Sequence, residues 1–237
     1  MTKLSVNINK IALLRNSRGA NLPNLIQVAQ HCIEFGAEGI TVHPRQDERH
    51  VRKSDIPLLK AAIEVELNIE GYPSPDFVQM VLDNHPAQVS LVPDAPSALT
   101  SDSGWDTREN LAFLKSIVSE FKSAGIRVSL FLNPYPQMVD YAYESGADRI
   151  EIYTGNYAEE FWKSPEHAIS RHIATAERAQ LLGLGLNAGH DLNLDNLAYY
   201  KQNVPGLLEV SIGHAIVCDA LYYGLQNTIQ MYLNKLR

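Results

Sequence analysis

Imidazole, guanidinium and carboxylate side chains are concentrated at a few points of the sequence, each directly after a short apolar run. One such cluster contains His43, Arg45 and His50. A guanidinium can hold a phosphate through two parallel N–H donors, and a histidine can add a third donor. We therefore expect a phosphate site here, although a solvated charged loop would have the same composition.

A second cluster combines glycine and histidine near the end of the chain. Gly213 and His214 fall where the last predicted helix begins, so free backbone N–H groups and the helix dipole favour an anion there. The run Asn187-Ala188-Gly189-His190-Asp191 closes the preceding apolar segment. Ordinary turn glycines would explain the same residues, but their position predicts a second phosphate site.

Glu70, followed by Gly71, is the strongest candidate for proton transfer. A carboxylate at the rim of a closed pocket has its pKa raised by the loss of hydration, which suits general acid–base catalysis near neutral pH. The alternative is a structural salt bridge between Glu70 and a loop arginine.

Other chemistries lack their sequence signatures. The chain has no HxH or HExxH pattern for a metal, no GxSxG for a serine nucleophile and no GxGxxG for a dinucleotide. No lysine ends a late strand, as a Schiff-base aldolase would require. We therefore expect neither a metal nor a cofactor.

The composition indicates a single globular domain spanning residues 1–237, with 45% hydrophobic and 20% charged residues. The formal net charge of −7 argues against nucleic acid as a partner. The sequence contains no leader and no 18-residue apolar run, and its two cysteines, Cys32 and Cys218, are interpreted as buried thiols. These features predict a cytoplasmic protein with no membrane partner.

Short apolar runs alternate with longer amphipathic segments, which predicts eight strand-plus-helix units. The predicted strands are Leu4–Asn9, Gly39–His43, Glu66–Glu70, Gln88–Val92, Ile126–Phe131, Arg149–Tyr153, Leu184–Asn187 and Leu207–Ile212. The predicted helices are Pro23–Phe35, Asp55–Glu64, Pro75–Asn84, Thr107–Ala124, Pro136–Ser145, Pro165–Leu182 and Ala215–Leu236. Eight such units are what a closed (β/α)₈ barrel needs, with its chemistry at the carboxyl ends of the strands.

Within the strands, apolar and polar residues alternate with period two, which predicts apolar side chains facing the helices and polar ones facing the barrel lumen. The residues expected in the lumen are Asn7, Thr41, His43, Glu70, Glu151 and Ser211. The residues expected to face outward are Ile8, Val42, Ile69, Ile152 and Ile212. An antiparallel sheet with one wet face would show the same alternation.

One segment of the chain is echoed 110 residues later: Gly36–His43 resembles Gly146–Tyr153. These segments contain the second and sixth predicted strands, four apart, as two half-barrels would give. A doubly wound open sheet is the other fold considered, and it normally has a glycine-rich loop after its first strand.

At these residues the sequence resembles the pyridoxine 5′-phosphate synthase family. The matching stretches are Val6–Lys10, Arg15–Gly19, Gly39–Arg45, Asp47–His50, Asn68–Glu70, Leu91–Pro93, Tyr153–Ala158, Leu186–His190 and Ile212–Ile216. They extend from the first strand to the last helix, so the resemblance covers the whole chain.

The resemblance implies a transferase that condenses 3-amino-2-oxopropyl phosphate with 1-deoxy-D-xylulose 5-phosphate to pyridoxine 5′-phosphate, phosphate and water. By the same resemblance, His43 and Glu70 are proton acceptors and His190 is a proton donor. The residues implied to bind the deoxyxylulose phosphate are Asn9, Lys10, Arg45, His50 and Thr100. Those implied to bind the amino-ketone phosphate are Asn7, Arg18, Asp191, Gly213 and His214.

The chain departs from the common family pattern at three positions. Many members have Asp-His where this chain has Asn9-Lys10, so an amide and a fixed cation replace a carboxylate and an imidazole there. Many have Gly in place of Asp191, whose carboxylate would repel a phosphate unless it points away. A phosphate-binding barrel without catalysis, or another sugar-phosphate enzyme such as an isomerase, is therefore an alternative. The family implies a homo-octamer.

Overall fold

The computed structural model describes residues 1–94 and 101–237, and eight parallel strands form its centre. The strands are β1 (Lys3–Asn7), β2 (Gly39–Val42), β3 (Glu66–Gly71), β4 (Gln88–Leu91), β5 (Arg127–Leu132), β6 (Arg149–Ile152), β7 (Gly185–His190) and β8 (Leu207–Ile212). They follow one another around a closed barrel in chain order, and β8 pairs with β1. The predicted (β/α)₈ barrel is therefore confirmed, and both alternative sheets are wrong.

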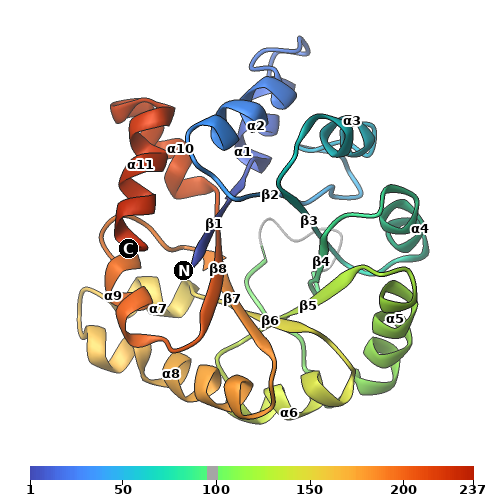
Figure 1. Cartoon of the computed structure of the whole chain (residues 1–237), viewed down its shortest axis with the longest axis vertical. Coiled ribbons are helices and arrows are strands. Elements are labelled where there is room, and N and C mark those ends of the chain that lie inside the picture. The colour runs from blue at the N-terminus through green and yellow to red at the C-terminus, as the bar shows by residue number, and fades with distance from the viewer. Residues whose placement is uncertain (95–100) are drawn as a thin grey trace.

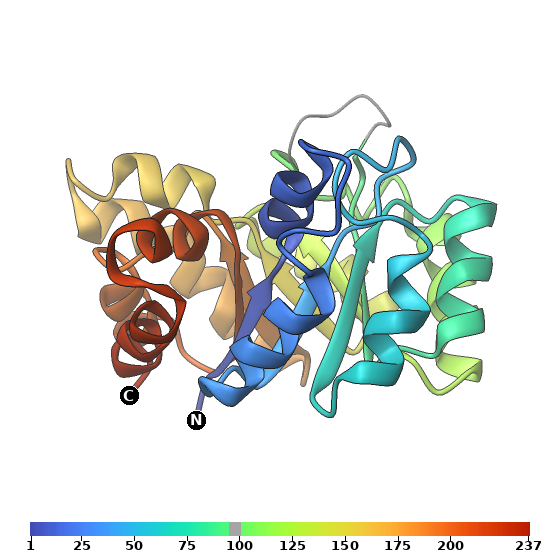
Figure 2. The same ribbon diagram turned by 90° about the horizontal axis from the view of Figure 1, so that it is seen from above.

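The helices surround the strands, as the view down the barrel in Figure 1 and the perpendicular view in Figure 2 show. They are α1 (Asn9–Asn16), α2 (Leu25–Glu34), α3 (Asp55–Ala62), α4 (Pro75–Asn84), α5 (Leu111–Ser123), α6 (Pro136–Glu144), α7 (Gly155–Glu160), α8 (Pro165–Leu181), α9 (Leu197–Asn203), α10 (His214–Tyr223) and α11 (Leu225–Lys235). Within the described residues, no helix has the length and apolar character to cross a bilayer.

The structure differs from the predicted elements mainly at the two ends of the chain. The first strand stops at Asn7, and Asn9 begins helix α1, which was not predicted. The last predicted helix is two helices, because Gly224 adopts a left-handed φ of 76° that ends α10. The short helices α7 and α9 were also not predicted. Cys32 is buried as expected, but Cys218 is only half-buried.

The predicted facing of the strand residues is confirmed. The apolar set lies in the buried core between barrel and helices, with Ile40, Ile69 and Ile150 fully buried. The polar set meets inside the barrel, where the hydroxyl groups of Ser5 and Thr41 lie 2.7 Å apart. Further along, the Ser90 hydroxyl lies 3.2 Å from Asn68 Oδ1 and 3.3 Å from Glu151 Oε2, and it can donate to either. These contacts join side chains of β1, β2, β3, β4 and β6 into a polar column inside the lumen.

Charged groups close the amino-terminal end of this column. Arg127 contacts Glu66 at 2.5 Å, and Lys3 contacts the other oxygen of Glu66 at 3.1 Å. Beside them, Arg149 lies 3.3 Å from Glu209 and donates to Asn187 at 3.0 Å. Each cation here has an anionic partner, so this end of the barrel is held by satisfied ion pairs.

Candidate active site

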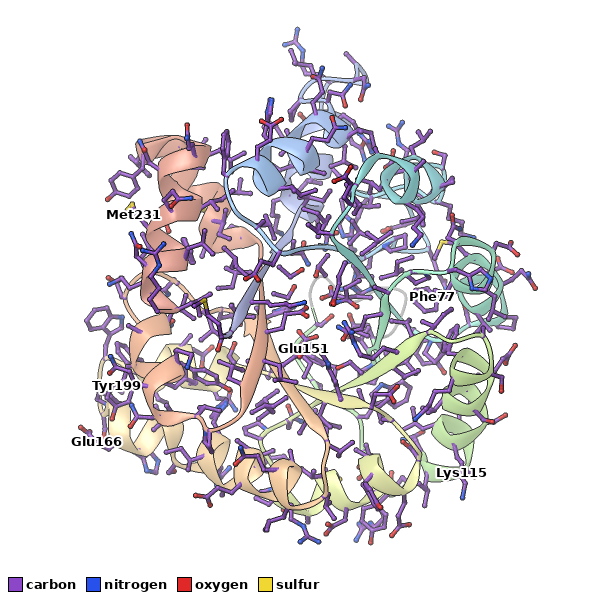
Figure 3. All side chains as sticks on the ribbon, in the orientation of Figure 1. Phe77, Lys115, Glu151, Glu166, Tyr199 and Met231 are labelled. Carbon is purple, nitrogen blue, oxygen red and sulfur yellow. The ribbon has the colours of Figure 1, made fainter. Side chains whose placement is uncertain are left out.

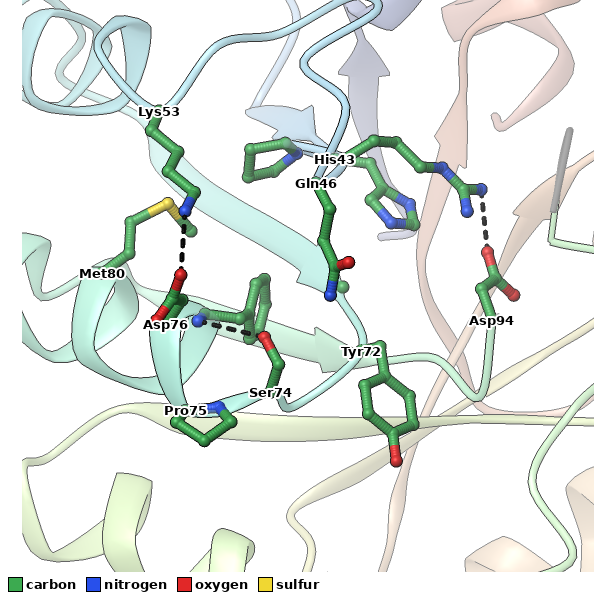
Figure 4. A pocket seen from close by; sticks show the side chains of 13 residues that line it. His43, Gln46, Lys53, Tyr72, Ser74, Pro75, Asp76, Met80 and Asp94 are labelled. Carbon is green, nitrogen blue, oxygen red and sulfur yellow. Dashed lines mark hydrogen bonds and ion pairs between the residues drawn. The ribbon is translucent and has the colours of Figure 1, made fainter. Parts of the chain in front are cut away.

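Two of the cavities at the carboxyl ends of the strands contain residues predicted from the sequence. The first, of about 420 Å³, follows β2, β3 and β4 and is drawn in Figure 4. Its lining comprises His43, Pro44, Arg45, Gln46, Lys53, Gly71, Tyr72, Ser74, Pro75, Asp76, Phe77, Met80 and Asp94. It contains two members of the predicted histidine–arginine cluster.

The second cavity, of about 340 Å³, follows β6, β7 and β8. Its lining comprises Tyr153, Gly155, Ala158, Glu159, His190, Asp191, Asn193, His214 and Ala215. The predicted residues His190, Asp191 and His214, which come from two different strand ends, are brought together here. The two cavities thus correspond to the two clusters identified in the sequence.

His43 and Glu70 form a buried pair at the rim of the barrel. His43 Nδ1 lies 3.8 Å from Glu70 Oε2, and Asn7 Nδ2 donates to the same oxygen at 3.4 Å. Burial, together with the nearby Arg45 charge, lowers the pKa of His43 well below its usual value. Burial and the neighbouring carboxylate of Glu151 raise the pKa of Glu70 well above its usual value. Burial thus disfavours the charged form of both groups in this pair.

Arg45 is buried but not fully satisfied. Its Nη2 lies 2.8 Å from Asp94 Oδ2 and donates to Ser101 Oγ at 3.4 Å. Its Nε is buried and has no hydrogen-bond partner among the residues that the structure describes. A buried guanidinium N–H without an acceptor is rare, and an anionic ligand would satisfy it.

His50 lies behind His43, with the two ring centroids 6.4 Å apart. Its Nδ1 accepts a hydrogen bond from the backbone N–H of Val51 at 2.9 Å, which leaves Nε2 to carry the proton. Burial, followed by the charges of Arg45 and Arg49, lowers the pKa of His50 to about 4. His50 is therefore a neutral hydrogen-bond donor near pH 7.

The two residues of the unusual Asn9-Lys10 pair have different surroundings: Asn9 is hydrogen-bonded within the fold, and Lys10 is exposed to solvent. Asn9 Oδ1 accepts a hydrogen bond from the backbone N–H of His43 at 2.9 Å, and Asn9 N–H donates to Asn7 Oδ1 at 3.0 Å. The amide thus fixes the end of β2, where an acceptor is sufficient and no proton needs to move.

His190 has a left-handed backbone, with φ of 63°, which is uncommon for a residue other than glycine. The hydroxyl of Thr154 donates to the carbonyl of Gly189 directly before it. The His190 ring lies 5.9 Å from that of Phe131 and 6.0 Å from that of Tyr153, measured between centroids. This packing and the unusual backbone turn the imidazole into the second cavity.

Two other features of the second cavity bear on anion binding. Gly213 caps α10, and a Cβ there would meet the backbone oxygen of Asn7 at 2.8 Å, so the close approach of β8 to β1 requires glycine. His214 is the exposed first residue of α10. The Asp191 carboxylate lies 3.8 Å from His190 Nδ1 and is half exposed, so it can point to solvent.

Among the described residues, five of the predicted site residues line the two cavities: His43, Arg45, His190, Asp191 and His214. The linings do not include Asn7, Asn9, Lys10, His50, Glu70 and Gly213. Arg18 is exposed after α1, and neither cavity includes it among its described lining residues. Thr100 lies outside the described residues.

Three side chains at the site were given no role from the sequence. Glu151 projects into the centre of the barrel in Figure 3, and burial raises its pKa to about 7, opposed by the charge of His190. Asp94 and Tyr153 each line one cavity. Strand alternation had already placed Glu151 in the lumen, whereas nothing in the sequence distinguished Asp94 from other loop carboxylates.

The fold and this rim of acid–base groups define a (β/α)₈-barrel enzyme of the kind that acts at the carboxyl ends of its strands. Residues 4–237 match the family model described as "Pyridoxal phosphate biosynthesis protein PdxJ", and the chain belongs to this family.

Similar proteins extend over the whole chain. A protein of Bacteroides thetaiotaomicron is 56% identical over 100% of both chains, and one of Cytophaga hutchinsonii is 57% identical over 100% of both. Both are named pyridoxine 5′-phosphate synthase. Among solved structures, 3-keto-L-gulonate-6-phosphate decarboxylase from Vibrio cholerae has a TM-score of 0.66 at 8% identity, covering 99% of this chain and 97% of its own. At that identity the likeness concerns the fold alone.

Proposed function

We propose that this chain is a pyridoxine 5′-phosphate synthase. It condenses 3-amino-2-oxopropyl phosphate with 1-deoxy-D-xylulose 5-phosphate, releasing pyridoxine 5′-phosphate, phosphate and water. The observation that carries the proposal is the pair of cavities at one barrel mouth, with the buried His43–Glu70 pair at the same rim. The family and the names of its 56–57% identical relatives support the same reaction.

Each cavity takes one phosphate in this proposal. Arg45 offers its unpartnered Nε, and His50 its Nε2–H, to the phosphate of the deoxyxylulose. The family resemblance assigns Asn9 and Lys10 to the same substrate, together with Thr100, which lies outside the described residues. Opposite, the N-terminus of α10 favours the phosphate of the amino ketone. The residues assigned to that side are Asn7, Arg18, Asp191, Gly213 and His214.

Proton transfer is assigned to the three groups predicted from the sequence. His43 is held neutral by burial, so it can accept a proton at neutral pH. Burial raises the pKa of Glu70, which suits a carboxylate that accepts a proton and later returns it. His190, which lines the second cavity, acts as the donor.

The test is to incubate the pure protein with both substrates and follow the absorbance of the pyridine product together with the released phosphate. Equal amounts of the two products are expected. Binding of both phosphates without product would favour a phosphate-binding barrel without catalysis. Conversion of either phosphate alone would favour another sugar-phosphate enzyme, such as an isomerase.

We further propose a cytoplasmic homo-octamer in which residues 1–237 form one barrel domain. Light scattering coupled to size-exclusion chromatography measures the assembly directly, and a mass other than eight times 26.4 kDa would contradict the octamer.

A further inference from the structure

Asp94 lies just beyond β4 and meets Arg45 at the wall of the first cavity, which both residues line (Figure 4). The side chains of Arg45 and Asp94 are 7% and 5% exposed, so their 2.8 Å contact is shielded from water. Ser101 joins them: its hydroxyl donates to Asp94 Oδ2 and accepts from Arg45 Nη2. Three side chains, from two loops, therefore form one buried cluster.

The cluster uses only part of the guanidinium. Arg45 Nη2 is held by Asp94 and Ser101, whereas Arg45 Nε is buried and unpartnered within the described part of the chain. The guanidinium is planar, so fixing Nη2 also fixes the direction of Nε. A buried donor held in this way is prepared for an acceptor that arrives from the cavity.

We infer that Asp94 is a positioning residue: it orients Arg45 so that Nε remains available to an anion, and its charge offsets that of Arg45 at this wall of the cavity. The identity of the phosphorylated substrate rests on the proposed function, but the inference itself concerns any phosphate in this cavity. The carboxylate also limits anion affinity, since it places a negative charge at the same wall.

The charge offset follows from what surrounds Glu70. The titratable or charged groups that act on it are His43, Arg45, Asp94, Glu151 and Glu209. The Arg45 charge favours the ionised form of Glu70, and the Asp94 charge opposes that effect. Without the Asp94 charge, the guanidinium would favour the ionised form of Glu70 more strongly, so the pKa of Glu70 would fall.

The first experiment measures the binding of inorganic phosphate by calorimetry at fixed pH and ionic strength. The relevant site is the one lost in Arg45→Ala. Asp94→Asn keeps an acceptor for Nη2 but removes the charge, so phosphate should bind about 3- to 10-fold more tightly. Asp94→Ala loses the acceptor as well and should bind less tightly than Asp94→Asn. Asp83→Asn, on the exposed face of α4, is the matched control and should bind like the wild type.

The second experiment follows the Glu70 carboxyl by ¹³C NMR in protein labelled at glutamate, with the Glu70→Gln spectrum for assignment. In Asp94→Asn the titration of Glu70 should move to lower pH by about one pH unit, and in Asp83→Asn it should stay in place. An unmoved Glu70 titration, or weakening of phosphate binding to the same extent in Asp94→Asn and Asp94→Ala, would overturn the inference. Both readouts are independent of turnover, so failure to form pyridoxine 5′-phosphate would contradict the proposed function alone.

Discussion

Both ends of the barrel lumen contain buried or partly buried arginine and glutamate side chains, but the two ends differ in how completely the polar atoms of these side chains are paired. At the amino-terminal end, Arg127 and Arg149 are paired with Glu66 and Glu209. At the carboxyl end, Arg45 is paired with Asp94 through Nη2 but has a buried Nε without a partner among the described residues. Burial at that end lowers the pKa of His43 and raises the pKa of Glu70.

The difference separates groups that hold the fold from groups that await a ligand. A buried cation that is fully paired contributes to structure, and breaking its pair leaves a charge that costs free energy. A buried polar group left incomplete destabilises the protein, and such groups persist where function uses them. Substitutions at the two ends should therefore have opposite consequences for turnover and stability.

The largest effect on turnover is expected for Glu70→Gln. Glutamine keeps the shape but cannot transfer the proton, so turnover should fall by about 10²- to 10⁴-fold. Since burial raises the pKa of Glu70, its ionisation opposes folding above its unfolded pKa, and the substitution should leave the melting temperature unchanged or raise it near pH 7. Steady-state kinetics and calorimetry measure both. Near-normal turnover would mean that Glu70 is structural and that His43 and His190 do the acid–base work.

Arg45→Ala tests the assignment of the two cavities. Losing a charged contact should weaken binding of the deoxyxylulose phosphate by about 2–3 kcal/mol, which is roughly 30- to 150-fold in affinity. The amino-ketone phosphate should be affected far less. Arg127→Ala, at the other end of the lumen, is the matched control. Equal weakening of both substrates in Arg45→Ala would mean that the phosphate sites are misassigned.

Arg149→Ala should show the opposite pattern. It removes the partner of Glu209, so the free energy of unfolding should fall by about 1–3 kcal/mol in urea titrations. Turnover by the folded fraction should stay within about twofold of the wild type, because the distant rim is untouched. A selective loss of turnover without loss of stability would contradict the division between the two ends.

The smallest effect concerns pH. Burial raises the pKa of Glu151 to about 7, above its unfolded value, so Glu151 binds more protons in the folded state between about pH 4.5 and 7. Stability from this group is fully present below that window and is lost as the pH rises through it. Glu151→Gln should make the slope of unfolding free energy against pH less negative, by at most about 1.4 kcal/mol per pH unit. An unchanged slope would show that Glu151 does not titrate in this range.

Much of this arrangement could be predicted because it depends on local patterns. Period-two alternation places Thr41 and Glu151 in the lumen, since neighbouring side chains of a strand point to opposite faces. The positions of His43 and Glu70 at strand ends place them on the catalytic rim of a parallel barrel. Both arguments need only the strand and its direction.

What could not be predicted depends on contacts between distant segments. The pairing of Arg45 with Asp94 joins two loops, and the sequence does not specify which carboxylate meets which guanidinium. Helix α1 was missed because alternation continues through Ile8 to Asn9, while the chain already turns there and Asn9 binds the end of β2. Gly224 was missed as a helix end because the residues on both sides favour helix.

The sequence similarity between Gly36–His43 and Gly146–Tyr153 corresponds to two segments on opposite sides of the closed barrel. Strands β2 and β6 lie half a turn apart, so His43 and Tyr153 occupy equivalent places related by an approximate two-fold axis along the barrel. The cavities obey the same symmetry, because one follows β2 to β4 and the other β6 to β8. Two phosphorylated molecules seated from opposite sides would point their free ends at this axis. The distance between the two cavities would then limit the combined length of the two substrates that can react with each other.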